Sequence, residues 1–282
     1  MGARVVARFT LVVLVTVLGS SVPVPAQSSD LQQVLGAVAA YVESYVARIQ
    51  SIIGTETVLV QPLGRDLSLD GRARRLQYEL RLEPNPLDDT MSAVRTRSLV
   101  KVDGRPASSD GLTTCLDPLE PVEFLRARRQ EEFVFTAAGS ATFDGRRAHV
   151  VQFRGRTPGD VRATWAERCG KIDTPGRTRG RVWVDAVSHA VLRLEESLTA
   201  PVDLQVPREQ QRWVGVPVLT LERADTTVRY RRVRFSEPDE EVFLPERIET
   251  LTVFQNGRNP RLRMTYQYGD YHRFVTGGRI VE

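Results

Sequence analysis

The side chains that most often do chemistry are scattered along this sequence. Its three histidines, His149, His189 and His272, lie far apart, and none stands at metal-ligand spacing from a cysteine or a carboxylate. Nucleophilic catalysis needs an activated Ser, Cys or Thr beside a base, but the chain has no G-x-S-x-G elbow. Ser188 directly precedes His189, which is typical of a turn. The sequence therefore predicts no catalytic residue, no metal site and no cofactor.

Neighbouring carboxylates occur at residues 131–132, 195–196 and 239–241. General acid-base catalysis needs at least one such group in a buried or otherwise perturbing environment. Nothing in the sequence predicts burial of any of them, so we expect solvated strand ends and turns. An enzyme whose residues converge only in three dimensions remains an alternative, and it would require a polar cleft holding a histidine or a carboxylate pair.

Two cysteines, Cys115 and Cys169, are present. An oxidising compartment would favour their pairing as a disulfide. A bridge between them would close a loop of roughly 55 residues and contribute about 4 kcal/mol on the chain-entropy model. Two buried free thiols are the alternative, whereas a metal pair lacks further ligands.

The charges of the chain are nearly balanced, with 39 Lys and Arg against 35 Asp and Glu. Arginines alternate with acidic residues throughout, and even the arginine-rich segment 229–234 is followed by an acidic stretch. Cross-strand ion pairing is therefore expected there. The charge pattern gives no reason to expect a nucleic-acid partner.

The first 26 residues have the pattern of a secretory signal peptide. Arg4 and Arg8 form a basic head, residues 12–18 an apolar run, and residues 24–26 a small-residue exit. The apolar run is shorter than the roughly 20 residues that span a bilayer. The sequence thus predicts a periplasmic or secreted protein, not an integral membrane protein once the signal is cleaved; an uncleaved N-terminal anchor is the alternative.

The remaining residues, 27–282, are expected to form a single domain that starts with one long amphipathic helix. Apolar residues recur at steps of three and four over residues 31–53, with Ser29 and Gln32 in a capping-box pattern and Gly54 placed to end the helix. A helical insert is expected near residues 117–130, where prolines precede an apolar segment. The segments 156–179 and 201–217 show no clear period and are expected to be loops.

Most of the other residues alternate in the two-residue period of β-strands. Asp144-Gly145 and Asn256-Gly257 supply turn chemistry between such segments. Consecutive strands with short links favour an antiparallel sheet. In residues 181–185, Val182 and Val184 point one way while Trp183 points the other. We therefore expect an α+β fold in which a curved antiparallel sheet, a half-barrel apolar on one face, wraps around the N-terminal helix.

Three segments resemble proteins of the lipoprotein-carrier superfamily, LolA/LolB-like, and their exported bacterial relatives. They are the hairpin 180–195 (GRVWVDAVSHAVLRLE), the hairpin 143–153 (FDGRRAHVVQF) and the ending 266–274 (YQYGDYHRF). The resemblance implies a half-barrel whose apolar interior can hold acyl chains or a lipid-linked partner. This chain departs from the pattern by its insert at 117–130 and its segment 201–217.

The sequence thus predicts a non-enzymatic binding protein that shelters a lipid or a lipidated segment between helix and sheet. Tyr41, Tyr45 and Ile49 of the helix, together with Trp183, are the expected lining residues. The alternative is a module for binding or sensing another envelope protein, with a filled core and its edge strands or loops as the docking surface. The presence or absence of a cavity under the helix would distinguish the two.

Overall fold

The computed structural model describes residues 27–84, 93–107, 121–166, 169–258 and 261–274. The predicted signal peptide and Cys115 lie outside these residues. The elements, in chain order, are α1 (Gln27–Arg48), β1 (Ile52–Pro62), β2 (Arg74–Pro84), β3 (Ala93–Val102), β4 (Arg105–Pro106), the 3-10 helix η1 (Pro121–Leu125), α2 (Ala127–Gln130), β5 (Phe133–Phe143), β6 (Arg146–Gly155), β7 (Arg162–Ala166), β8 (Cys169–Asp173), β9 (Thr178–Asp185), β10 (Val191–Leu198), β11 (Val202–Gln205), α3 (Arg208–Val214), β12 (Val218–Ser236), β13 (Asp239–Phe254) and β14 (Arg261–Arg273).

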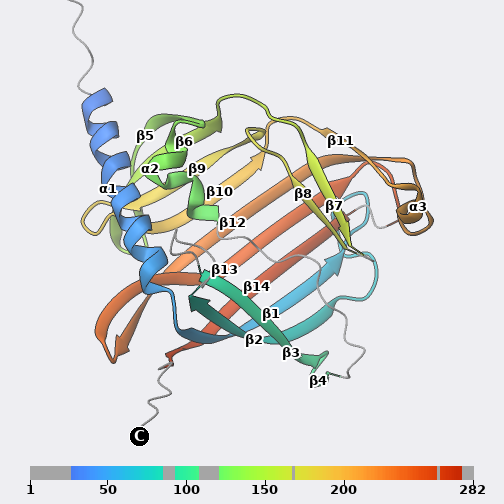
Figure 1. The fold of residues 1–282 in the computed structure, drawn as a ribbon, viewed down its shortest axis with the longest axis horizontal. Coiled ribbons are helices and arrows are strands. Elements are labelled where there is room, and N and C mark those ends of the chain that lie inside the picture. Colours follow the sequence, from blue (N-terminus) through green and yellow to red (C-terminus); the bar gives the residue numbers. More distant parts are fainter. Residues whose placement is uncertain (1–26, 85–92, 108–120, 167–168, 259–260, 275–282) are drawn as a thin grey trace, which may run out of the picture.

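One large antiparallel sheet dominates the fold, as the alternating sequence pattern predicted (Figure 1). Its strand order is β4-β3-β2-β1-β14-β13-β12-β10-β9-β6-β5, and β11 adds to β12. The first strand pairs with the last, because residues 52–62 run antiparallel to residues 262–273. In the described part of the chain the path ends at β4 and β5 without closing, so the sheet is open and consistent with a curved half-barrel.

A β-bulge interrupts the pairing of one long strand. Residues 218–236 form β12, with a register shift between Leu221 and Arg223. At this bulge one extra residue, Glu222, is accommodated in β12, and the pairing of β12 with β13 continues on both sides of it. Segments 156–179 and 201–217, expected as loops, contain the β7–β8 hairpin and β11 with α3, respectively.

Helix α1 begins and ends earlier in the chain than predicted, at Gln27 and Arg48. Ile52 and Ile53 open β1 after Ser51, whose φ is 62°. Two adjacent β-branched residues favour the strand, and here they gain ladder partners in both β2 and β14. Ile52 fitted the predicted helical pattern because it too is buried in the core, although it belongs to strand β1.

Two hydrophobic clusters lie on the same face of the sheet, which we call the helix face. The larger cluster joins the buried side of α1 to β1, β2, β9, β10 and β12–β14. The smaller one joins Leu198, Leu219 and Leu221 to the β7–β8 hairpin through Trp165 and Ile172. Register places Leu198 on the face that Leu194 shares with Val228, both members of the larger cluster. The two ends of this face are thus covered by α1 and by β7–β8 (Figure 1).

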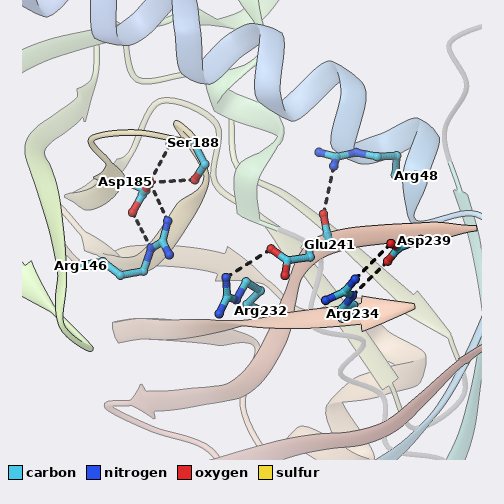
Figure 2. A network of polar contacts seen from close by, with 8 residues as sticks. All are labelled: Arg48, Arg146, Asp185, Ser188, Arg232, Arg234, Asp239 and Glu241. Atoms are coloured by element: carbon cyan, nitrogen blue, oxygen red, sulfur yellow. Dashed lines mark hydrogen bonds and ion pairs between the residues drawn. The ribbon is translucent and has the colours of Figure 1, made fainter. Parts of the chain in front are cut away.

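Polar contacts fix α1 in place at several points along its length. Glu43 accepts hydrogen bonds from Nε and Nη2 of Arg126, at 2.9 and 2.5 Å, and the Gln130 side chain donates to the Leu35 carbonyl at 2.9 Å. At the helix end, Arg48 donates to the Glu241 carbonyl at 3.3 Å, beside the Arg232–Glu241 ion pair (Figure 2). The short segment η1–α2 and the β12–β13 hairpin therefore hold the helix. The wrapping of the sheet around α1 remains a prediction.

Candidate binding site

The helix residues predicted to line a cavity lie in the larger hydrophobic cluster. Tyr45 and Ile49 are buried, and Tyr41 is half-buried with its ring stacked on that of Tyr45 at 6.3 Å. Beneath them, Val58 and Tyr266 expose none of their surface. The helix residues and the sheet residues beneath them thus belong to one buried cluster.

The structure does not bring Trp183 together with these three residues. Val182 and Val184 belong to the cluster under α1, and Trp183 stands between them in β9. Because successive strand residues alternate, Trp183 lies on the opposite face, which we call the outer face. There the Arg193 guanidinium lies 5.2 Å from the indole ring centre. A ligand-lining role for this tryptophan stays a prediction, but it would concern a different surface.

Between the two hydrophobic clusters a row of residues crosses the helix face, and we call it the open strip. Register places its members directly opposite one another in four successive pairs: Glu196 with Thr226, Thr226 with Thr250, Thr250 with Met264, and Met264 with Val60. Met264 is buried, and the other four are half-buried. At a strand spacing of about 4.8 Å the strip is roughly 19 Å long. Along β12, the strip residue Thr226 lies between Val228 of the larger cluster and Leu221 of the smaller cluster.

The strip is polar at one end and apolar at the other. Burial raises the pKa of the Glu196 carboxyl above its usual value, and a hydrogen bond with Thr178 opposes this only in part. The Thr250 hydroxyl is buried and has no hydrogen-bond partner among the described residues. Met264 and Val60 make the other end apolar. The sequence analysis missed this row because its members come from five strands whose register only the fold defines.

A second set of residues missed from the sequence is a buried ionic cluster on the same face. Glu56 is fully buried and accepts hydrogen bonds from Arg97 and, at 2.8 Å, from Arg95. Arg95 also donates to the Tyr268 hydroxyl at 3.0 Å, and burial raises the pKa of that hydroxyl above its usual range. The sequence contained a sign of this burial, because Glu56 stands at the same alternate positions of β1 as the apolar residues Ile52 and Val58. Such a cluster fixes the position of β3 against β1.

The hairpin that carries the strongest motif is built around Asp185 (Figure 2). Its carboxylate is buried and accepts hydrogen bonds from Arg146, from the backbone of Val187, and from the backbone and hydroxyl of Ser188. The Ser188 hydroxyl donates to Asp185 at 2.8 Å, and His189 takes φ 59° in the turn. The adjacent Ser188 and His189 thus lie in the hairpin turn, as predicted, and the His189 N–H donates to the Asp185 carbonyl at 3.0 Å.

Other candidate sites are absent from the described residues or lie outside them. Within those residues no group of three or more His, Cys, Asp and Glu could hold a metal ion. None of the described helices combines the length and the apolar character needed to cross a membrane. The predicted Cys115–Cys169 disulfide involves side chains outside the described part and stays a prediction.

Comparisons with known proteins find similarity in structure alone. No protein-family model matches the chain, and a comparison with curated proteins finds no match either. Among solved structures, the chain is similar to a LolA superfamily protein from Nitrosomonas europaea, with 12% identity, 89% of this chain and 96% of that chain covered, and a TM-score of 0.35. A DUF1329 family protein from Desulfovibrio piger shares 8% identity over 88% of this chain and 95% of that chain, with a TM-score of 0.44.

A third structure, described as an outer membrane lipoprotein-sorting protein domain from Vibrio parahaemolyticus, shares 13% identity over 88% of this chain and 95% of that chain, with a TM-score of 0.38. The resemblance that the three sequence segments indicated is therefore confirmed as a similarity. At TM-scores this low the similarity carries no information on a ligand or a partner.

Proposed function

We propose that this chain is an exported, non-enzymatic binding protein that shelters an apolar chain, such as the acyl chain of a lipid or of a lipidated segment. The observation that supports the proposal is the open strip, a half-buried row flanked on the same face by two hydrophobic clusters. Its length of roughly 19 Å suits one long acyl chain lying across the strands. Burial of apolar surface, at about 25 cal/mol per Å², would drive binding.

The proposal moves the ligand away from the buried side of α1. Tyr45 and Ile49 are buried in the larger hydrophobic cluster, so we place the ligand beside this cluster, on the open strip. Tyr41 is half-buried at the margin of the same cluster, where its ring stacks on Tyr45 and the Arg48 guanidinium lies 5.5 Å from its ring centre.

Mass spectrometry of organic extracts of the purified protein and titration with a fluorescent fatty acid test this function. Thr226→Trp places an indole on the strip and should weaken fatty-acid binding by about tenfold or more. Leu251→Trp is the matched control, because Leu251 follows the strip residue Thr250 in β13, faces outward and should leave the affinity unchanged. Absence of a copurifying lipid together with absence of saturable binding would overturn the proposal.

The alternative, a module that binds another envelope protein, is favoured by one observation at the sheet edge. Strand β5 pairs with β6 alone in the described sheet, and its residues 136–142 carry no charge and are mostly exposed. An uncharged edge lacks the usual protection against adding a further strand. Thr142→Lys on this edge should release a stoichiometric envelope partner, whereas Val187→Lys in the exposed turn should retain it.

A further inference from the structure

A hollow opens on the outer face of the sheet, and its border includes two residues of the open strip, Glu196 and Thr226. Its volume is about 920 Å³, and residues of β5, β6, β9, β10 and β12 line it. Its apolar lining residues are Val134 of the outer face and, at its border, Phe153 and Leu198 of the helix face. Most of the remaining lining is polar and rich in hydrogen-bond donors: Thr136, Gln152, Ser197, Thr227 and four arginines.

The two acidic residues of the hollow that lie on the outer face, Glu195 and Asp225, already have basic partners. Arg193 contacts Glu195 at 2.6 Å, and Arg223 contacts Asp225 at 2.5 Å. Glu196 also borders the hollow, but its position in β10 directs it to the helix face. The negative charge within the hollow is therefore largely neutralised from within the protein.

Three arginines of the same hollow have no such partner. Arg154, Arg179 and Arg181 are exposed, and none forms a hydrogen bond or an ion pair with a carboxylate among the described residues. The contrast with Arg193 and Arg223 leaves a local excess of positive charge, although the charge of the whole chain is nearly balanced.

Strand register concentrates this charge. Arg154 of β6 lies directly opposite Arg179 of β9, and Arg181 follows two residues later on the same face. Directly opposite residues have Cβ atoms about 5 Å apart, and like charges in such a pair repel each other. Alternate residues of one strand stand about 6.7 Å apart. An anion bridging Arg154 and Arg179 would remove the repulsion between them.

We propose that this hollow binds a phosphate group. A phosphate concentrates its charge on one compact group, which two guanidinium forks at cross-strand distance can share through paired N–H···O bonds. An acidic peptide is a poorer match, because carboxylates on alternate residues would follow Arg179 and Arg181 along β9 and leave Arg154 without a partner. The hydroxyl and amide donors of Thr136, Gln152 and Ser197 suit the remaining phosphate oxygens.

Calorimetric titration of the full chain with inorganic phosphate at low ionic strength tests the proposal. The variant R154Q/R179Q should lose at least about tenfold in affinity, and the wild-type affinity should fall as salt is raised. The matched control R247Q/R263Q removes the same charge from the same face outside this hollow and should change the affinity less than about twofold. Circular dichroism establishes that both variants are folded.

Flotation with vesicles of phosphatidylglycerol in phosphatidylcholine identifies the source of the phosphate. Binding of both inorganic phosphate and vesicles, lost in R154Q/R179Q, supports a lipid headgroup as ligand. Binding of inorganic phosphate alone supports a soluble phosphate ester. Equal losses in the two double variants, no saturable phosphate binding, or binding of a poly-aspartate peptide without phosphate binding would each overturn the proposal.

Discussion

Asp185 accepts hydrogen bonds from Nε of Arg146 at 2.6 Å and from Nη2 at 3.0 Å, although 39 residues separate the two in sequence. The pair ties the start of β6 to the turn between β9 and β10, and thus joins the two hairpins that carry the sequence motifs. Burial alone would raise the pKa of the Asp185 carboxyl. The hydrogen bonds from Arg146, Ser188 and Val187 outweigh burial and hold this pKa well below its ordinary value of 3.8.

The lowered pKa makes stability depend on pH in a defined direction. A carboxyl whose pKa is lower in the folded than in the unfolded state stabilises the protein fully above the unfolded value, and this contribution disappears as pH falls through the folded value. Asp185→Asn should therefore lower the free energy of unfolding at pH 7 by about 2–3 kcal/mol. Below pH 3.8, the free energy of unfolding of this variant should fall less steeply with pH than that of the wild type. Urea denaturation at a series of pH values measures both effects.

Asp239→Asn is the control for this prediction. Asp239 also pairs with an arginine, Arg234, at 3.0 Å, but both side chains are about two-thirds exposed. Exposed pairs contribute little, so its loss should change the free energy of unfolding by less than about 0.5 kcal/mol. A pH profile of the Asp185 variant that parallels the wild type would contradict the assigned role.

Gly180, the first residue of the same motif, is required by a close backbone approach. A Cβ at this position would lie 1.9 Å from the Glu195 carbonyl oxygen and 2.7 Å from Cζ of Phe153. Gly180→Ala must therefore push β9 away from β10, and we expect a loss of about 2–4 kcal/mol in the free energy of unfolding. Thermal denaturation followed by circular dichroism checks this value.

Gly36 gives the opposite expectation within the same protein. It lies in α1, and a Cβ there would meet nothing within 4 Å. Gly36→Ala should raise the free energy of unfolding by about 0.5–1 kcal/mol, because alanine favours the helix. Equal effects of the two substitutions would show that backbone crowding does not distinguish these sites.

The sequence was sufficient to predict the antiparallel sheet, the N-terminal helix and the hairpin at 180–195, because these depend on local periodicity and turn residues. It could not predict that β1 pairs with β14, because this pairing joins residues near the two ends of the described chain. For the same reason the open strip and the Arg154–Arg179 pair were not predicted, since register across several strands creates both. Asp185 could be recognised as a motif residue, but its partner Arg146 lies in another hairpin.

Glu56 should be among the residues least tolerant of substitution. Its carboxylate is fully buried between Arg95 and Arg97, so Glu56→Gln would leave two largely buried guanidinium groups without their shared anion. Breaking a buried ion pair from one side costs about 3–5 kcal/mol. Chemical denaturation should show a loss of this size, with β3 the first strand to lose amide protection in hydrogen exchange.

Glu79→Gln is the matched control on the neighbouring strand. Glu79 pairs with Arg81 at 2.8 Å on the outer face, where both side chains are more than 40% exposed. We expect a change of less than about 1 kcal/mol. Similar losses in the two variants would mean that the Glu56 cluster contributes no more than a surface pair.

Thr250→Val should stabilise the protein, the reverse of the usual effect of a core substitution. The Thr250 hydroxyl is buried without a hydrogen-bond partner among the described residues, so its desolvation is uncompensated. Valine keeps the branched shape and removes the polar atom, and the free energy of unfolding should rise by about 1 kcal/mol. Thr252→Val, on the same face of β13 but without such a buried hydroxyl, should change it by less than about 0.5 kcal/mol. Urea denaturation that finds Thr250→Val less stable than the wild type would show that this hydroxyl has a partner in solution.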